Sequence, residues 1–217
     1  MSKIVFIAPA RPIAEAAEKI LAEMNVQIPV FVGANEEAVQ IVSAHPEADI
    51  IISRGGTADD IRRQTPKTVV EITVSVSDLM KPVNRLAKAG HKRIGIVAKY
   101  NMMDDACEDL EIGELQVFMR PWREMDELTE IFKEFSDLSV LGVVADKYAA
   151  KIAQERGLTP EFLESGPVAL KRAIASAVTI DNAQEIERAR SQERAEQLQQ
   201  IISEIVCTIE KDADVVE

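Results

Sequence analysis

Short apolar runs alternate with helix-like segments along the first 165 residues, and this alternation limits the fold more than any other feature of the chain. The run Asp49–Ser53 is apolar almost throughout, as expected of a strand buried on both faces. Strands are expected at Ile4–Ala8, Ile28–Val32, Asp49–Ser53 and Thr68–Ile72, and helices at Arg11–Glu23, Asn35–Ala44 and Ala58–Gln64. Because strands and helices alternate, the sequence predicts a parallel sheet with right-handed crossovers.

The second half of the chain repeats this order. Ile4–Ala8 corresponds to Ile94–Ala98, Ile28–Val32 to Leu115–Met119, and Asp49–Ser53 to Val140–Val144, each about 90 positions later, which indicates an internal duplication. Strands are expected at Arg93–Ala98, Glu114–Met119, Val140–Ala145 and Glu161–Glu164, and helices at Val76–Lys88, Met125–Phe135, Asp146–Arg156 and from Pro167 onward. The expected fold is therefore α/β, with two three-layer lobes.

Three regions follow from this pattern. Residues 1–75 form the first lobe, completed by the helix near 167–182, residues 76–165 form the second lobe, and residues 183–217 form a C-terminal helix. The chain is expected to cross between the lobes near 73–77 and 164–167. In the last region Leu198, Ile202, Ile205 and Ile209 recur at coiled-coil spacing. This helix either packs its apolar stripe on the lobes or serves as a dimerising, signalling helix that leads to a domain absent from this chain.

Charge and composition exclude several functions. Asp and Glu total 37 against 25 Lys and Arg, a net charge of −12, which argues against direct binding to nucleic acid or to an anionic membrane. No apolar run approaches the ~18 residues that span a bilayer. The two cysteines lack metal or redox spacing and there are only two histidines, so we expect a cytoplasmic protein with no metal and no cofactor.

In open parallel sheets, ligands bind beyond the carboxyl ends of the strands, and the loop Arg54–Thr57 follows such an end. Gly55 and Gly56 let the backbone approach a ligand, Thr57 can cap the next helix, and Arg54 offers a forked cation suited to carboxylate or phosphate. The alternative is an ordinary tight turn with a surface arginine. The expected ligand-binding set, drawn from all such loops, is Ala10, Arg11, Arg54, Gly55, Gly56, Thr57, Lys99, Tyr100, Asn101, Asp146, Lys147, Ser165 and Gly166.

Several other features of the sequence could be either functional or purely structural. Ser165 and Gly166 form either a second anion cradle or a capped turn before Pro167. Glu71, in an apolar strand, either reaches a cleft or pairs with a cation, and we favour the pair. The acidic stretch 104–111 lacks the pattern of a calcium loop and is expected to be a solvated helix face. Trp122 is expected in a loop, where it either packs against the protein, which we favour, or stacks on a ligand. No catalytic constellation can be assembled.

Several segments resemble one protein family. They are Ala48–Ala58, Val69–Ile72, Val76–Leu79, Arg93–Val97, Gly142–Asp146, Ala153–Leu158 and Glu164–Gly166. In order and spacing, over about residues 1–180, these resemble the N-terminal receptor domain of propionate catabolism activators, which are sigma-54-dependent transcription regulators. The resemblance implies two flavodoxin-like lobes in a chelatase-like duplication around a cleft, with the C-terminal helix crossing back to the first lobe. It also implies a sensor of a small metabolite, methylcitrate in the propionate regulator, that controls an ATPase domain. This chain stops before any ATPase or DNA-binding domain, and its effector stays open.

The leading hypothesis is a non-catalytic sensory domain, forming a homodimer, that binds a small di- or tricarboxylate-like anion between its lobes and signals through the C-terminal helix. An alternative is a small isomerase, racemase or lyase with two thiols or acids facing across a cleft. The positions of Cys107 and Cys207 are not symmetrical in the two halves, which counts against it. A third hypothesis is an interaction module that binds no small molecule and dimerises through residues 184–217.

Overall fold

The computed structural model of the 217-residue chain describes residues 3–103 and 108–213. The chain divides into two compact units, Met1–Ala177 and Val178–Glu217. The first unit holds both β-sheets and all helices except most of the last one. The second unit is the remainder of the continuous helix α7 (Pro167–Ala213), in which Ile186, Leu198, Ile201 and Ile202 are exposed. No described helix is both long and apolar enough to cross a bilayer.

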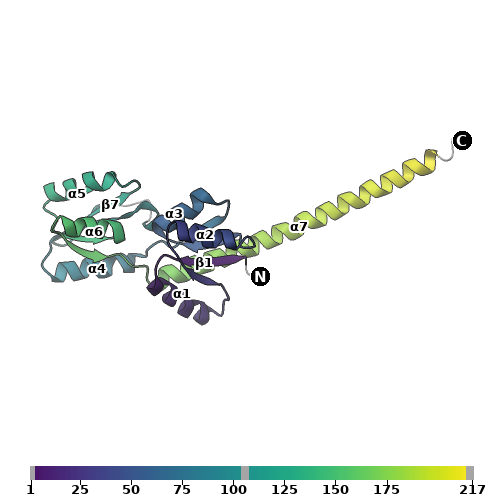
Figure 1. Cartoon of the computed structure of the whole chain (residues 1–217). Coiled ribbons are helices and arrows are strands. Elements are labelled where there is room, and N and C mark those ends of the chain that lie inside the picture. The colour runs from purple at the N-terminus through teal and green to yellow at the C-terminus, as the bar shows by residue number, and fades with distance from the viewer. Residues whose placement is uncertain (1–2, 104–107, 214–217) are drawn as a thin grey trace. The chain divides into compact units, whose positions relative to one another are not determined.

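The first sheet has four parallel strands in the order β2-β1-β3-β4. Its elements are β1 (Ile4–Ala8), α1 (Arg11–Met24), β2 (Val30–Val32), α2 (Glu36–Ala44), β3 (Ile50–Ser53), α3 (Gly55–Gln64) and β4 (Thr68–Glu71). Side chains of α2 and α3 pack on one face of this sheet, where Ala38, Val42 and Ile61 meet Val5 and Ile51. Helix α1 lies on the opposite face (Figure 1).

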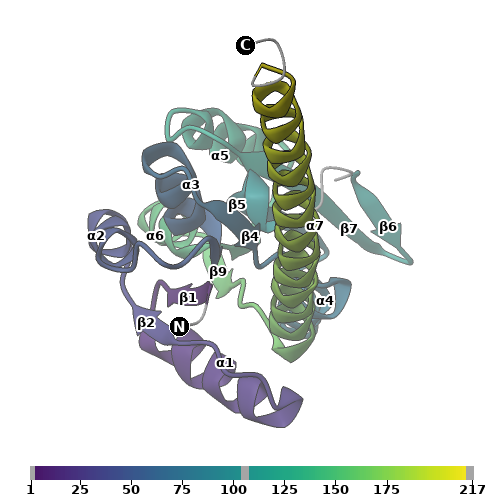
Figure 2. The same ribbon diagram turned by 90° about the vertical axis from the view of Figure 1, so that its right-hand side faces the viewer.

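The second sheet repeats this order with one strand added, β6-β7-β5-β8-β9. Its elements are α4 (Val76–Lys88), β5 (Arg93–Lys99), the 3-10 helix η1 (Tyr100–Met102), β6 (Leu110–Ile112), β7 (Leu115–Trp122), α5 (Glu127–Asp137), β8 (Gly142–Ala145), α6 (Lys147–Glu155) and β9 (Thr159–Phe162). All pairs are parallel except β6–β7, a hairpin at the sheet's edge (Figure 2). Strands β7-β5-β8-β9 correspond to β2-β1-β3-β4, so the duplication expected from the sequence is confirmed.

Each sheet is partly covered by a helix that follows, in the sequence, the last strand of the other sheet. Helix α4 follows β4 of the first sheet but packs on β5, β8 and β9 of the second. Helix α7 follows β9 of the second sheet, and Lys171 in its second turn pairs with Glu23 at the end of α1, 2.8 Å apart. The chain therefore crosses between lobes at residues 72–75 and 163–166.

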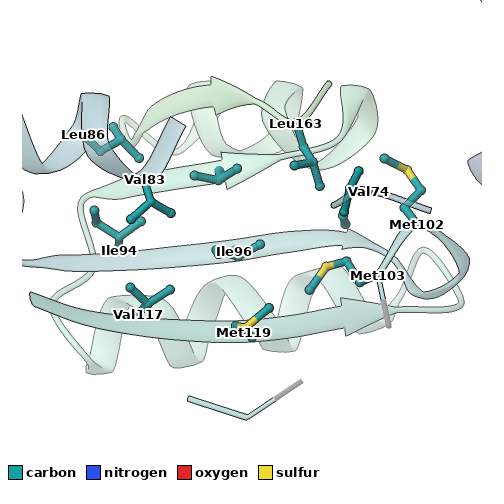
Figure 3. Packing of buried hydrophobic residues seen from close by; sticks show 12 residues of the cluster. Val74, Val83, Leu86, Ile94, Ile96, Met102, Met103, Val117, Met119 and Leu163 are labelled. Carbon is teal, nitrogen blue, oxygen red and sulfur yellow. The ribbon is translucent and has the colours of Figure 1, made fainter. Parts of the chain in front are cut away.

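The second lobe has an apolar core on each face of its sheet. Helices α5 and α6 cover one face, where Phe132 and Phe135 pack with Val97 and Val143. Helix α4 covers the other, and Figure 3 shows Val83 and Leu86 above Ile94. The same cluster extends to Val74, Met102, Met103 and Leu163 at the carboxyl end of the sheet (Figure 3). Both crossings between the lobes are thus anchored in one core.

Three expectations from the sequence are wrong in detail. The third helix begins at Gly55 and not at Ala58, because Arg54 serves as its N-cap residue. Residues 108–111 are not a helix face, since Leu110–Ile112 forms strand β6, while residues 104–107 lie outside the described residues. Trp122 is the last residue of β7, where it is buried by packing as expected, but it is not in a loop.

Candidate functional site

The carboxyl ends of the two sheets meet. Asn101, just after β5, donates through Nδ2 to the carbonyl oxygen of Gly55, just after β3, at 2.9 Å. The backbone N–H of Val74, just after β4, donates to the carbonyl oxygen of Met102 at 2.9 Å. Loops that the sequence predicted separately therefore lie together. We call residues 54–59, 99–102 and 163–166 the lobe junction.

Arg54 is the buried cation of the lobe junction, with 9% of its surface exposed. Its Nη2 donates to the carbonyl oxygen of Leu163 at 3.1 Å and lies 3.6 Å from the sulfur of Met102. No carboxylate of the described residues lies within ion-pair distance of it. A guanidinium has five N–H donors, so most of this donor capacity is not committed to protein oxygen.

The surroundings of Arg54 act on its charge in two directions. Burial lowers its pKa, because the charged form loses hydration. The negative charges of Asp146, Glu164 and Asp78 oppose that effect from beyond contact distance. Because arginine side chains stay charged in proteins, the guanidinium is a cation in a poorly hydrated position, which favours a bound anion with two coplanar oxygens.

The two glycines of the Arg54–Thr57 loop lie in the first turn of α3. Gly55 has φ +54°, a left-handed conformation that favours glycine, and a Cβ there would lie 3.2 Å from the sulfur of Met102. At Gly56 a Cβ would meet no atom within 4 Å, so the space beside its backbone is open. The prediction that Thr57 caps the helix is wrong, since Arg54 occupies the N-cap position and Thr57 is buried inside the first turn.

A polar network centred on Asp59 joins the lobes. Its Oδ1 accepts hydrogen bonds from Tyr100 Oη (3.1 Å), Asn101 Nδ2 (3.3 Å) and Arg62 Nη1 (3.3 Å). Its Oδ2 has no hydrogen-bond donor in the structure and lies 3.6 Å from the ammonium of Lys99. Asp59 is 4% exposed, so its carboxylate is shielded from bulk water. Through it, side chains of the second lobe are held against α3. Lys99, Tyr100 and Asn101, which the sequence predicted as ligand-binding residues, all contact the first lobe at the lobe junction.

Sequence reasoning missed Asp59 and Arg62. The expected helix began at Ala58, which left Asp59 as an unremarkable residue of a first turn. The actual start at Gly55 places Asp59 one turn into α3 on the side of the second lobe. Glu71 pairs with Arg62 and accepts from Asn101 Nδ2 at 3.2 Å, so the prediction that it pairs with a cation is confirmed.

Tyr100 has a perturbed hydroxyl. Burial and the hydrogen bond to Asp59 raise its pKa above the ordinary value, because the phenolate would lose hydration and face a carboxylate. The guanidinium of Arg123 lies 3.9 Å from the centroid of its ring. The hydroxyl therefore stays a hydrogen-bond donor at neutral pH.

Asp146 is fully engaged by the protein. Its Oδ1 accepts from the backbone N–H groups of Tyr148 (3.0 Å) and Ala149 (2.9 Å), which caps α6. Its Oδ2 accepts from the backbone N–H of Lys99 (2.7 Å) and from Trp122 Nε1 (2.8 Å). The carboxylate thus fixes the strand end from which Lys99, Tyr100 and Asn101 reach the first lobe.

The two crossings between the lobes touch. Asp78 and Ser75 form a reciprocal capping box at the start of α4. A Cβ on Gly166 would lie 2.2 Å from Asp78 Oδ1, so only glycine fits beside this cap. The hydroxyl oxygen of Ser165 is buried without a hydrogen-bond partner in the structure.

Other residues of the predicted set lie apart from these contacts. Ala10 is the exposed N-cap residue of α1, and Arg11 pairs with Glu15 along the same helix at 3.2 Å. Lys147 is exposed at the start of α6. Among the described side chains, no group of three or more His, Cys, Asp or Glu residues is placed to hold a metal ion.

A family model described as "Propionate catabolism activator" matches residues 22–193, which include both lobes except for the first strand and most of the first helix. The chain belongs to this family. It is the same family that the segment Ala48–Ala58 and the other segments quoted from the sequence resemble. Its members are transcription regulators.

A solved structure, an NtrC-family transcriptional regulator from Clostridium acetobutylicum, has the same fold. Its TM-score is 0.63 at 23% sequence identity, over 83% of this chain and 97% of that one. The two flavodoxin-like lobes of propionate catabolism activators are thus present in this chain. No curated protein matches the chain.

Proposed function

We propose that this chain is the sensory domain of a sigma-54-dependent transcription activator of the propionate catabolism type. In this proposal it binds a small anionic metabolite between its two lobes and signals through α7. It acts in the cytoplasm by regulating other domains, and it catalyses no reaction.

The observation that carries the proposal is Arg54. A buried guanidinium without a carboxylate partner among the described residues is costly unless something else compensates it. Its place at the meeting carboxyl ends of two parallel sheets is where such folds bind ligands. A carboxylate of the metabolite would supply the missing partner through two parallel hydrogen bonds.

The rest of the lobe junction favours a ligand with more than one anionic group. The open space beside Gly56 adjoins the first turn of α3, whose free N–H groups attract negative charge. Ser165 offers a hydroxyl that has no protein partner in the structure. A di- or tricarboxylate would use these donors together with Arg54, and Lys99, Tyr100 and Asn101 would line the second-lobe side.

The test is binding to the purified chain. A thermal-melt screen against di- and tricarboxylates, sugar phosphates and nucleotides comes first, because a ligand at ~100 times its dissociation constant adds about 2.7 kcal/mol to folding stability. Calorimetry with the best ligand then compares Arg54→Ala with Arg11→Ala, an exposed arginine that serves as the matched control.

We expect Arg54→Ala to weaken binding by about 30-fold or more, since it removes charged hydrogen bonds worth about 2 kcal/mol. Arg11→Ala should bind as the original chain does. Equal affinity of the two variants would remove Arg54 from the site, and no binding of any tested anion would contradict the proposal.

We also propose that the domain is a homodimer through α7, since Leu198, Ile201 and Ile202 are exposed within its second unit. Truncation after residue 183 should convert a dimer into a monomer in light scattering. A truncated chain that remains dimeric would exclude α7 as the interface.

A further inference from the structure

We infer that Leu163–Gly166, which we call the connector, carries the signal of anion binding from Arg54 to α7. The Arg54–Leu163 hydrogen bond is the contact that the anion replaces. This inference rests on the proposed function, because it requires that Arg54 binds the anion.

The connector begins at Leu163, which is held from both lobes. Its backbone N–H donates to the carbonyl oxygen of Ala145 at 2.8 Å, and its own carbonyl oxygen accepts from Arg54 Nη2 at 3.1 Å. Its side chain is 4% exposed and packs with Val74 and Met102 (Figure 3). Arg54, the residue proposed to bind the anion, thus makes the hydrogen bond that joins the first lobe to Leu163.

The connector ends at Gly166, which is held by the first turn of α7 and by α4. The N–H of Leu170 donates to the carbonyl oxygen of Gly166 at 3.2 Å, so Gly166 starts the hydrogen-bonded ladder of α7. Its Cα hydrogen faces Asp78, whose Oδ2 is fixed by the backbone N–H (3.0 Å) and hydroxyl (2.8 Å) of Ser75. The four-residue connector is therefore fixed at both ends and is too short to absorb a displacement of Leu163 without transmitting it.

Arg54 has N–H groups beyond the one bonded to Leu163, but two coplanar hydrogen bonds to a carboxylate set the orientation of the whole guanidinium and turn Nη2 away from Leu163. A carboxylate binds two N–H groups of arginine in one plane and is a stronger acceptor than a neutral carbonyl. When Nη2 turns toward the anion, the buried carbonyl of Leu163 loses its donor. A buried carbonyl without a donor is unfavourable, so the connector shifts and the start of α7 shifts with it.

Hydrogen exchange of the full chain, measured by mass spectrometry over residues 163–171, tests this inference. Arg54→Met, which removes every donor but keeps the length of the side chain, should raise exchange in this segment by about 10-fold or more without any ligand. Exchange in β5 should stay within about twofold of the original chain. Saturating citrate, used as the probe, should raise exchange of the same segment in the original chain and in Arg11→Ala, and should add nothing in Arg54→Met.

A second variant leaves Arg54 intact. Gly166→Ala forces a methyl group against Asp78 and displaces the connector from its far end. Because coupling between two sites is reciprocal, this variant should exchange faster at 163–171 and bind citrate several-fold more tightly than the original chain. Its use keeps the test valid if Arg54→Met does not fold.

The outcomes separate the two proposals. If citrate binds through Arg54 while exchange at 163–171 stays unchanged, the inference is overturned and the proposed function stands. The same holds if Gly166→Ala alters neither exchange nor affinity. If neither citrate nor any other tested anion binds the original chain, the proposed function fails first and the inference falls with it.

Discussion

At the scale of single residues, the Asp146 carboxylate accepts four hydrogen bonds and holds the strand end that reaches the first lobe. Asp146→Asn keeps the shape but places an NH₂ group against N–H donors. We expect the free energy of unfolding to fall by about 2 to 3 kcal/mol, because buried donors lose their acceptor. Trp122, the one tryptophan of the chain, donates to this carboxylate, so its fluorescence reports the urea transition directly.

Lys147→Ala, at the next position and exposed, is the control for Asp146→Asn and should unfold at the urea concentration of the original chain. An unchanged midpoint for Asp146→Asn would show that the four hydrogen bonds contribute nothing net. The same contacts explain what the sequence alone can predict at this scale. The positions of Arg54 and Asp146 just after strands were enough to single out both residues. They did not show that all four hydrogen bonds of Asp146 come from the protein, or that Arg54 has no carboxylate partner among the described residues. Those facts depend on partners distant in sequence.

At the scale of elements, η1 is held against α3 by the hydroxyl of Tyr100 on Asp59. The folded-state pKa of Tyr100 is raised, so its contribution to stability is fully present below pH 10 and is lost as pH rises through the folded value. Tyr100→Phe should cost about 1 kcal/mol at pH 7 by removing the hydrogen bond. Since the variant has no phenol there to ionise, the stability difference should shrink as pH rises above about 10.

Urea unfolding of both proteins between pH 7 and 11 checks this, and absorbance of the phenolate near 295 nm identifies the group. The chain has two tyrosines, so the spectrum of Tyr100→Phe isolates the step that belongs to Tyr100. A stability difference that is constant with pH would mean that Tyr100 titrates equally in the folded and unfolded states. Tyr148, elsewhere on α6, remains in both proteins and cancels from the comparison.

The repeat of elements was predictable, but its one exception was not. Apolar periodicity predicted each strand of the β2-β1-β3-β4 order and its counterpart, because buried strands require such runs. In the second lobe, η1 and the β6–β7 hairpin follow β5, where α1 follows β1. Arg120 of β7 pairs with Asp109, just before β6, at 2.6 Å and with Glu134 of α5 at 2.6 Å. Residues 108–111 are held by contacts with β7, from Arg120 and the backbone N–H of Met119 to Asp109 and from Gln116 to Glu111. Such contacts leave no local signal in the sequence, which is why a solvated helix was expected.

At the scale of the whole two-lobed unit, the crossings make the lobes interdependent. The sheet of the second lobe is covered by α4, which comes directly from the first lobe, and α7 returns from β9 to pair with Glu23 of α1. Each sheet is therefore covered in part by a helix that lies outside the stretch of chain that forms its strands. We therefore expect the lobes to unfold together in a single transition, although each has its own core.

Ile51→Ala tests this interdependence. Ile51 is fully buried in the first lobe, and its truncation should cost about 2 to 5 kcal/mol, which lowers the melting temperature of a unit of this size by on the order of 10 °C. Trp122 lies in the second lobe. If the lobes unfold as one, Trp122 fluorescence in Ile51→Ala must shift by the same amount as the loss of helical circular dichroism. If the second lobe is independent, the tryptophan midpoint will stay at its original temperature while part of the helical signal is lost earlier. That outcome would also weaken the connector's role, because a link between lobes that unfold separately would transmit little displacement from Arg54 to α7.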